Sequence, residues 1–165
     1  MGPLKHKVVH RNDITAQHPA ESVLILGEED VRMDNGKYNY WETKTIGQGF
    51  VLRIDYCKRL IVGCKIKNKG KGGPGDSSNW ATDEFRVSGS VNETGPWKTL
   101  VESHLADTRG VNAPLVNFTF VEPVEIQYIK FELVSFWGDR GGGLQYFAAI
   151  PATSKCLPFG IVDLK

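Results

Sequence analysis

Residues suited to acid–base, nucleophilic or metal chemistry are scattered along the chain. The four histidines are His6, His10, His18 and His104. No Ser, Cys or Asp stands in a catalytic motif around any of them. Neighbouring carboxylates occur as Glu28-Glu29 and Asp83-Glu84, but adjacent acidic residues are more often solvated charges than a glycosidase pair. With no His or second Cys at zinc-ligand spacing, we expect neither a catalytic centre nor a structural zinc site.

A different chemistry, recognition of a polar ligand, is indicated by aromatic and polar side chains in three glycine-rich or polar segments. Aromatic faces pack on the C–H patches of sugars, and Asn, Asp and Arg form hydrogen bonds with hydroxyl groups. Arg or Lys could instead hold a carboxylate, sulfate or phosphate. The side chains that we expect to bind are Tyr38 and Tyr40 in the first segment, Lys71, Asp76, Asn79 and Trp80 in the second, and Trp137, Asp139 and Arg140 in the third.

The tryptophans also have a purely structural interpretation. Trp41 and Trp97 are expected to pack the core or its rim. For Trp80 and Trp137 the two interpretations stay open, because both lie in polar, glycine-rich segments where a core role is least secure.

The elements that must position these residues are predicted to be strands. In residues 50–56, Phe50, Leu52, Ile54 and Tyr56 alternate with polar residues, the pattern of a half-buried strand. Similar alternation occurs in residues 62–67, 85–88, 116–120 and 129–133, and turn-forming clusters separate these runs. No segment shows a sustained helical period. The pattern predicts an all-β, single-domain antiparallel sandwich, jelly roll or barrel.

Length and composition agree with one folded domain. The chain has 165 residues, a formal net charge of +1 and 41% hydrophobic residues. It shows no membrane-length apolar run, no visible secretory signal and no basic field suited to nucleic acid. We expect residues 1–21 to be a weakly patterned N-terminal extension, only partly ordered, and residues 22–165 to form the sandwich.

The cysteines and two glycosylation motifs give information about the cellular compartment of the protein. With three cysteines a dense disulfide framework is excluded, and we expect Cys57 and Cys64 to be buried free thiols. Asn92-Glu93-Thr94 and Asn117-Phe118-Thr119 are N-glycosylation sequons, of which Asn92, in a turn, is the better acceptor. We expect an extracellular or cell-surface domain, and a cytoplasmic one is the alternative.

The order of segments over residues 22–152 resembles the discoidin family, the coagulation factor type C domains. The segments that resemble motifs of this family are Asp34 to Trp41, Gly49 to Tyr56, Leu60 to Asn68, Thr82 to Ser90, Trp97, Ile129 to Leu133 and Trp137 to Gln145. The resemblance implies the galactose-binding-like jelly roll, with a ligand site in loops at one end. Many sugar-binding relatives hold calcium with the Asp-Gly turn and a Glu after the Gly-Gly-Leu segment. Here that region reads Gln145-Tyr146-Phe147, which leaves at most a weak calcium site near Asp34.

Two further family features are missing. Extracellular members often join their two ends by a disulfide, but here Cys156 has no cysteine near the start of the chain to pair with. The fucose-binding motif, a His followed by Arg-Gly-Asp, is also absent. We therefore expect a non-catalytic module that binds a glycan or glycoconjugate, with no resident cofactor. A phospholipid-binding or cell-adhesion domain and a protein–protein interaction module of the same fold are the alternatives. The loop tips carry Lys, Gly, Ser and Asp and no apolar residue except tryptophan, which favours a sugar or a protein over a membrane surface.

Overall fold

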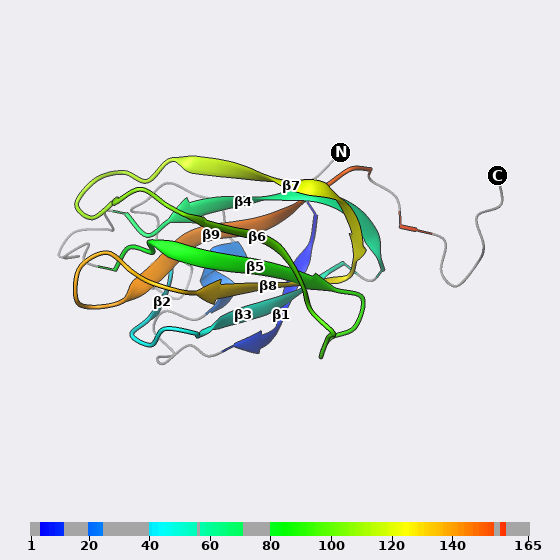
Figure 1. The fold of residues 1–165 in the computed structure, drawn as a ribbon, viewed down its shortest axis with the longest axis horizontal. Coiled ribbons are helices and arrows are strands. Elements are labelled where there is room, and N and C mark those ends of the chain that lie inside the picture. The colour runs from blue at the N-terminus through cyan, green and yellow to red at the C-terminus, as the bar shows by residue number, and fades with distance from the viewer. Residues whose placement is uncertain are drawn as a thin grey trace.

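The computed structural model describes residues 4–11, 20–24, 40–55, 57–70, 80–153 and 156–157, and these form two packed antiparallel sheets (Figure 1). One sheet has the strand order β1-β3-β8-β5-β6 and the other β2-β9-β4-β7. The strands are β1 (His6–Arg11), β2 (Trp41–Thr43), β3 (Gly49–Ile54), β4 (Arg59–Asn68), β5 (Glu84–Ser90), β6 (Lys98–His104), β7 (Leu115–Ile126), β8 (Tyr128–Leu133) and β9 (Gly142–Pro151). Helix in the described residues is limited to one 3-10 turn, η1 (Ala20–Leu24). The predicted β-sandwich is confirmed.

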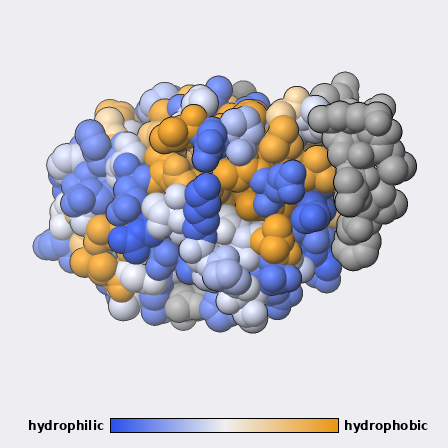
Figure 2. All heavy atoms as spheres, turned by 45° about the vertical axis from the view of Figure 1, so that its right-hand side comes forward, coloured by the Kyte–Doolittle hydropathy of each residue, from blue (hydrophilic) through white to orange (hydrophobic). Residues whose placement is uncertain are grey.

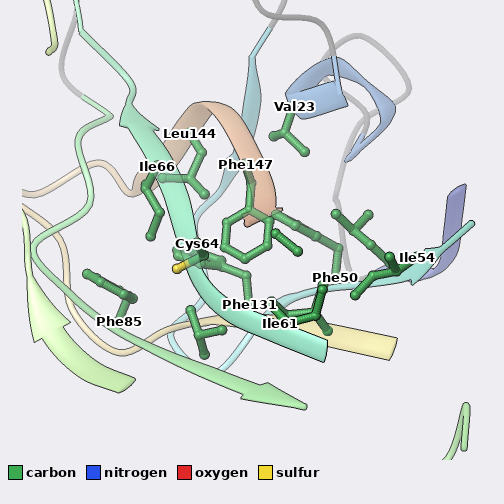
Figure 3. Close-up of a cluster of buried hydrophobic side chains, with 14 of the residues drawn as sticks. Val23, Phe50, Ile54, Ile61, Cys64, Ile66, Phe85, Phe131, Leu144 and Phe147 are labelled. Atoms are coloured by element: carbon green, nitrogen blue, oxygen red, sulfur yellow. The ribbon is translucent and has the colours of Figure 1, made fainter. Parts of the chain in front are cut away.

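The core lies between the sheets and is built from the alternating residues of both. Phe131 on β8 stacks on Phe50 of β3, with ring centroids 5.5 Å apart, and meets Phe147 of β9 edge-on at 5.8 Å. Trp41 is fully buried and packs edge-on against Phe50 and Phe131. Figure 3 shows this cluster between β4 and β9 on one side and β3 and β8 on the other. The predicted structural role of Trp41 is confirmed, and the aromatic contacts stabilise the packing of the two sheets.

Strand β4 departs from the predicted pattern at its first half. A register shift lies between Ile61 and Gly63, where β4 pairs with both β7 and β9. As a result Ile61 is fully buried, whereas Val62, expected on the core face with Cys64 and Ile66, is only half-buried. A bulge of this kind inserts one residue and reverses the facing of the residues before it.

The cysteines also differ from the prediction. Cys57 and Cys156 form a disulfide with Cα atoms 5.7 Å apart, so the expectation of a free thiol at Cys57 is wrong. The partner of Cys156 lies just before β4 and not near the start of the chain. The bridge joins the segment before β4 to the segment after β9, whose Ala152 N–H donates to the carbonyl of Leu60. Cys64 is a free, buried thiol as expected, and burial raises its pKa to about 12.

Residues assigned to the N-terminal extension contribute to the sandwich. β1 pairs with β3 at the edge of the five-stranded sheet, and Ala20 and Val23 of η1 are fully buried in the core. The boundary between extension and domain at residue 22 stays a prediction.

Candidate functional site

Four of the segments that connect the strands lie at one end of the sandwich and form the candidate site (Figure 1). They are residues 44–48 between β2 and β3, 80–83 before β5, 105–114 between β6 and β7, and 134–141 between β8 and β9. We call this the loop end. Thr82 forms an isolated antiparallel bridge with Phe136, so the second and fourth connections lie side by side.

A buried asparagine at the end of β4 holds two of these connections, residues 80–83 and 105–114, to the strand. The side-chain oxygen of Asn68 accepts from the main-chain N–H groups of Lys69 and Thr82, at 2.9 Å each. Its amide nitrogen donates to the carbonyls of Thr82 at 2.9 Å and Ala106 at 3.3 Å. Buried main-chain groups require such partners, so Asn68 supplies hydrogen bonds that irregular loop backbone cannot obtain from a neighbouring strand.

Two threonines extend this network. The hydroxyl of Thr82 donates to the carbonyl of Gly143 at 2.9 Å, and that of Thr108 donates to the carbonyl of Lys69 at 3.1 Å. Both threonines are buried. The base of the loop end is therefore rigid, and it presents the half-buried side chains above it in a defined arrangement.

Trp137 is one of those half-buried side chains. Its indole Nε1 donates to the carbonyl of Leu105 at 3.0 Å, and its main-chain N–H donates to the carbonyl of Ala81 at 2.9 Å. The polar edge of the ring is thus satisfied inside the protein, and the orientation of the ring is set by two connections distant in sequence.

Trp80 is also half-buried, and it lies against the glycine run that precedes β9. A Cβ atom at Gly141 would lie 2.7 Å from two carbon atoms of the Trp80 ring, and Gly141 has a φ of +156°. Only glycine lets the backbone approach the ring this closely. Nζ of Lys44 lies 5.9 Å from the Trp80 ring centroid, within range of a cation–π contact.

A pair of opposite charges lies beside Trp137. Arg109 donates to Asp107 through Nε at 2.9 Å and Nη2 at 2.7 Å, a bidentate contact. This hydrogen bonding lowers the pKa of Asp107 and raises the pKa of Arg109. The negative charge of Asp139 also raises the pKa of Arg109. A Cβ atom at Gly138 would lie 2.5 Å from Nη1 of Arg109, so the guanidinium packs directly on the backbone after Trp137.

The structure brings together four of the predicted binding residues. Trp80, Trp137, Asp139 and Arg140 lie on two neighbouring segments of the loop end, the last two exposed. Tyr40 is only 4% exposed, and Nζ of Lys69 lies 4.4 Å from its ring centroid. Its ring face is therefore covered by Lys69 and not open to a ligand. Tyr38, Lys71, Asp76, Asn79 and the calcium candidate Asp34 lie outside the described residues.

Sequence reasoning missed Asp107 and Arg109 as members of this site, and it did not anticipate that Lys69, in the second polar segment, is fully buried. The signal for the first two was present, because Asp107-Thr108-Arg109-Gly110 combines a turn glycine with a charge pair. Nothing in the sequence near Lys69 indicates its burial, since lysines in polar segments are usually exposed. Its ammonium donates to the carbonyl of Gly70 at 3.0 Å.

Apolar side chains also reach solvent at the loop end. Ile46, between β2 and β3, is 59% exposed, and Val111, between β6 and β7, is 52% exposed. The prediction that loop tips carry no apolar residue except tryptophan is therefore wrong. Periodicity did not reveal these residues because each is a single apolar side chain in a polar segment.

A groove of about 360 Å³ lies on the outer face of β3 and β8 and reaches Gly47 at the edge of the loop end. Trp97 lies in its wall, half-buried, with Nζ of Lys130 4.6 Å from its ring centroid. Trp97 is thus at the rim of the fold, as expected, and a cation already covers its ring. This makes Trp97 a reference tryptophan with no part in the loop end.

No group of three or more His, Cys, Asp or Glu side chains in the described part of the chain is arranged to hold a metal ion. Among these residues, no helix has the length and hydropathy needed to cross a membrane.

No protein-family model matches the chain, and no curated protein is significantly similar to it in sequence. Solved structures do match. The family 32 carbohydrate-binding module of Streptococcus pneumoniae EndoD has 15% sequence identity and a TM-score of 0.64, over 90% of this chain and 97% of that one. The family 32 module of Clostridium perfringens NanJ, in complex with galactose, has 14% identity and a TM-score of 0.59, over 88% of this chain and 92% of that one.

A further match is the Clostridium perfringens module CpGH89CBM32-5, in complex with GalNAc-β-1,3-galactose. It has 12% identity and a TM-score of 0.59, over 89% of this chain and 94% of that one. The chain has the same jelly-roll fold as these modules. At such identities the likeness concerns the fold, and the chemistry of the site has to be argued from this chain's own residues.

Proposed function

We propose that this chain is a non-catalytic carbohydrate-binding module, of the discoidin-like type, whose ligand site lies at the loop end. The observation that carries the proposal is the setting of Trp137. Its Nε1 is already satisfied by Leu105, its ring is only half-buried, and the Arg109–Asp107 pair lies beside it. An apolar ring face next to fixed donors and acceptors matches the two kinds of surface that a sugar presents.

The charges of the loop end suit a neutral, hydroxyl-rich ligand. Lys44, Arg109 and Arg140 are cationic, and Asp83, Asp107 and Asp139 are anionic. Because Arg109 is held by Asp107, it offers oriented N–H donors rather than a free positive charge. Solved structures of the same fold in complex with galactose or with GalNAc-β-1,3-galactose support these sugars as the first ligands to test.

The test is isothermal titration of galactose and GalNAc-β-1,3-galactose, with a uronic acid oligosaccharide as an acidic comparison. Trp137→Ala, Trp80→Ala and Arg109→Ala should each weaken binding by a factor of about ten, roughly 1.4 kcal/mol, as for truncation of a binding hot spot. Trp97→Ala is the matched control, because it removes a tryptophan distant from the loop end and should leave affinity unchanged. Intact glycan after long incubation would support a module without hydrolytic activity.

Two outcomes would contradict this proposal. If the wild-type chain binds none of the sugars on a broad glycan array, carbohydrate recognition is wrong. If Trp137→Ala lowers stability by about 3 to 5 kcal/mol but leaves affinity per folded molecule unchanged, Trp137 is a packing residue and the site lies elsewhere.

Phospholipid binding is a second candidate, favoured by the exposure of Ile46 and Val111 at the loop end. Single apolar side chains on loops can enter a membrane interface, and Lys44 and Arg109 would face anionic headgroups. Liposome sedimentation with phosphatidylserine vesicles tests it, using Ile46→Ser and Val111→Ser. If the wild-type chain sediments with the vesicles but binds none of the sugars, and both variants lose sedimentation, this candidate is supported over the first.

We also propose an extracellular or cell-surface location. The Cys57–Cys156 disulfide supports it, since stable disulfides form mainly in oxidising compartments. Rapid alkylation of thiols in intact cells, followed by mass spectrometry, should find Cys57 and Cys156 oxidised. If both are alkylated in the cell, the location is reducing.

A further inference from the structure

We propose that Asn92 carries an N-linked oligosaccharide. Asn92-Glu93-Thr94 is an N-glycosylation sequon that lies in the turn between β5 and β6. This inference is independent of the sugar-binding proposal, because it concerns a glycan attached to this chain and not one bound by it.

The local structure meets the steric requirement for a bulky modification. Asn92, Glu93 and Thr94 are all exposed. The main chain of Asn92 is held in the turn by its N–H, which donates to the hydroxyl of Ser90 at 3.0 Å, and by its carbonyl, which accepts from Gly95 at 3.2 Å. The side-chain amide of Asn92 forms no hydrogen bond with any other described residue, so a glycan on Nδ2 would break no contact within that part of the chain.

The second sequon provides an internal comparison. Asn117 is also exposed, but it lies inside strand β7, where it pairs with Lys65 of β4. Asn92 lies in a turn outside the strand ladder. Glycosylation acceptors favour surface loops, so Asn92 is the better acceptor of the two.

The disulfide supports exposure of the chain to the compartment in which this reaction occurs. Cys57 and Cys156 are bridged, as expected for passage through an oxidising secretory pathway. There a lipid-linked oligosaccharide diphosphate is the donor. Nδ2 of Asn92 forms a bond with C1 of the first sugar, the bond from C1 to the diphosphate oxygen breaks, and the amide releases one proton while the lipid diphosphate leaves.

The position of Asn92 determines which surfaces a glycan attached to it would cover. The β5–β6 turn lies at the end of the sandwich opposite the loop end (Figure 1), so the glycan would leave the candidate site open. Near Asn92, Val91 is 45% exposed, and it lines a shallow groove with Pro96, Leu100 and Pro123. Figure 2 turns this end forward and shows apolar side chains reaching the surface among polar ones. A glycan on Asn92 would shield such surface from self-association.

The test is secretion of the full chain from eukaryotic cells, followed by peptide N-glycosidase F, which removes N-glycans and converts the glycosylated Asn to Asp. We expect faster gel migration after digestion and conversion of Asn92 to Asp in the tryptic peptide. Asn92→Gln and Thr94→Ala should abolish this shift, whereas Thr94→Ser, which keeps a sequon, should retain it. Asn117→Gln should leave glycosylation of Asn92 intact.

The inference is overturned if secreted, disulfide-bonded wild-type chain shows no modification of Asn92. It is also overturned if the whole shift persists in Asn92→Gln and disappears in Asn117→Gln. Thermal melting of each variant controls for misfolding, and because the exchanged side chains are exposed, their melting temperatures should match that of enzymatically deglycosylated wild type.

Discussion

The main-chain N–H of Ala149 donates a hydrogen bond of 3.1 Å to Nε2 of His6, 143 positions earlier in the chain. Nδ1 of His6 lies 3.0 Å from the carbonyl oxygen of Leu4, so Nδ1 carries the proton and the imidazole is neutral. His6 belongs to β1 of one sheet and Ala149 to β9 of the other. This contact therefore links the two sheets at the N-terminal strand.

Protonation of His6 should destabilise the fold. Burial lowers the pKa of His6 below 6.5, although the Leu4 carbonyl and the charge of Asp55 oppose the shift. Below about pH 6.5 the unfolded state binds more protons at this position than the folded state, so the free energy of unfolding falls as the pH falls and is fully retained above about pH 6.5. Thermal melts at about pH 7.5 and about pH 5.5 should show a smaller pH effect in His6→Gln than in wild type. His10→Gln, on the same strand but exposed, should behave as wild type; an equal pH effect in all three proteins would contradict this assignment.

Reduction of the disulfide should lower stability strongly. Cys57 and Cys156 are 99 positions apart. A cross-link that closes a loop of that length lowers the conformational entropy of the unfolded chain and so stabilises the folded state by about 4 to 5 kcal/mol. A paired Cys57→Ser and Cys156→Ser variant should lose stability on that scale in urea unfolding, whereas Cys64→Ala should differ by its packing cost alone. Thiol titration of the denatured chain should give one thiol before reduction and three after it, in line with one free cysteine. Three thiols before reduction would refute the bridge.

Removal of the Asn68 side chain should loosen the loop end. Asn68→Ala leaves the buried N–H and carbonyl of Thr82 without this partner, and unsatisfied buried groups cost about 1–3 kcal/mol each. We expect a loss of at least about 2 kcal/mol in urea unfolding, together with weaker sugar binding. The exposed Asn92→Ala is the control for an asparagine without such contacts. Unchanged stability in Asn68→Ala would show that water replaces the amide.

Chelation by EDTA should leave the melting temperature unchanged. The second carboxylate of a calcium site is missing, because Gln145 occupies that region and is 2% exposed on β9. A site saturated at a hundredfold excess over Kd would contribute about 2.7 kcal/mol, a shift on the order of 5–10 °C for a chain of this size. A fall of that size on adding EDTA, reversed by calcium, would establish a metal site involving Asp34 or its neighbours.

Strand positions and the identity of the core were predictable from the sequence, because alternation is a local property. Phe50, Leu52 and Ile54 are buried on β3, as the pattern of residues 50–56 predicts, and Phe131 is buried on β8 for the same reason. The same reasoning failed at Val62, where the bulge in β4 depends on pairing with two neighbouring strands at once. Local periodicity contains no information about the partners of a strand.

Contacts between distant segments were decided by the tertiary structure. The sequence identified Trp137 and Asp139 as candidates, but only the fold places the Arg109–Asp107 pair beside them, through a connection about 30 positions away. The sequence indicated Tyr40 as a binding residue, but the structure buries it in contact with Lys69, which is also buried. The pairing of Cys57 with Cys156 likewise depends on β4 and β9 being neighbours. Residue types determine which groups can interact, whereas the distances between them are set by how the two sheets pack.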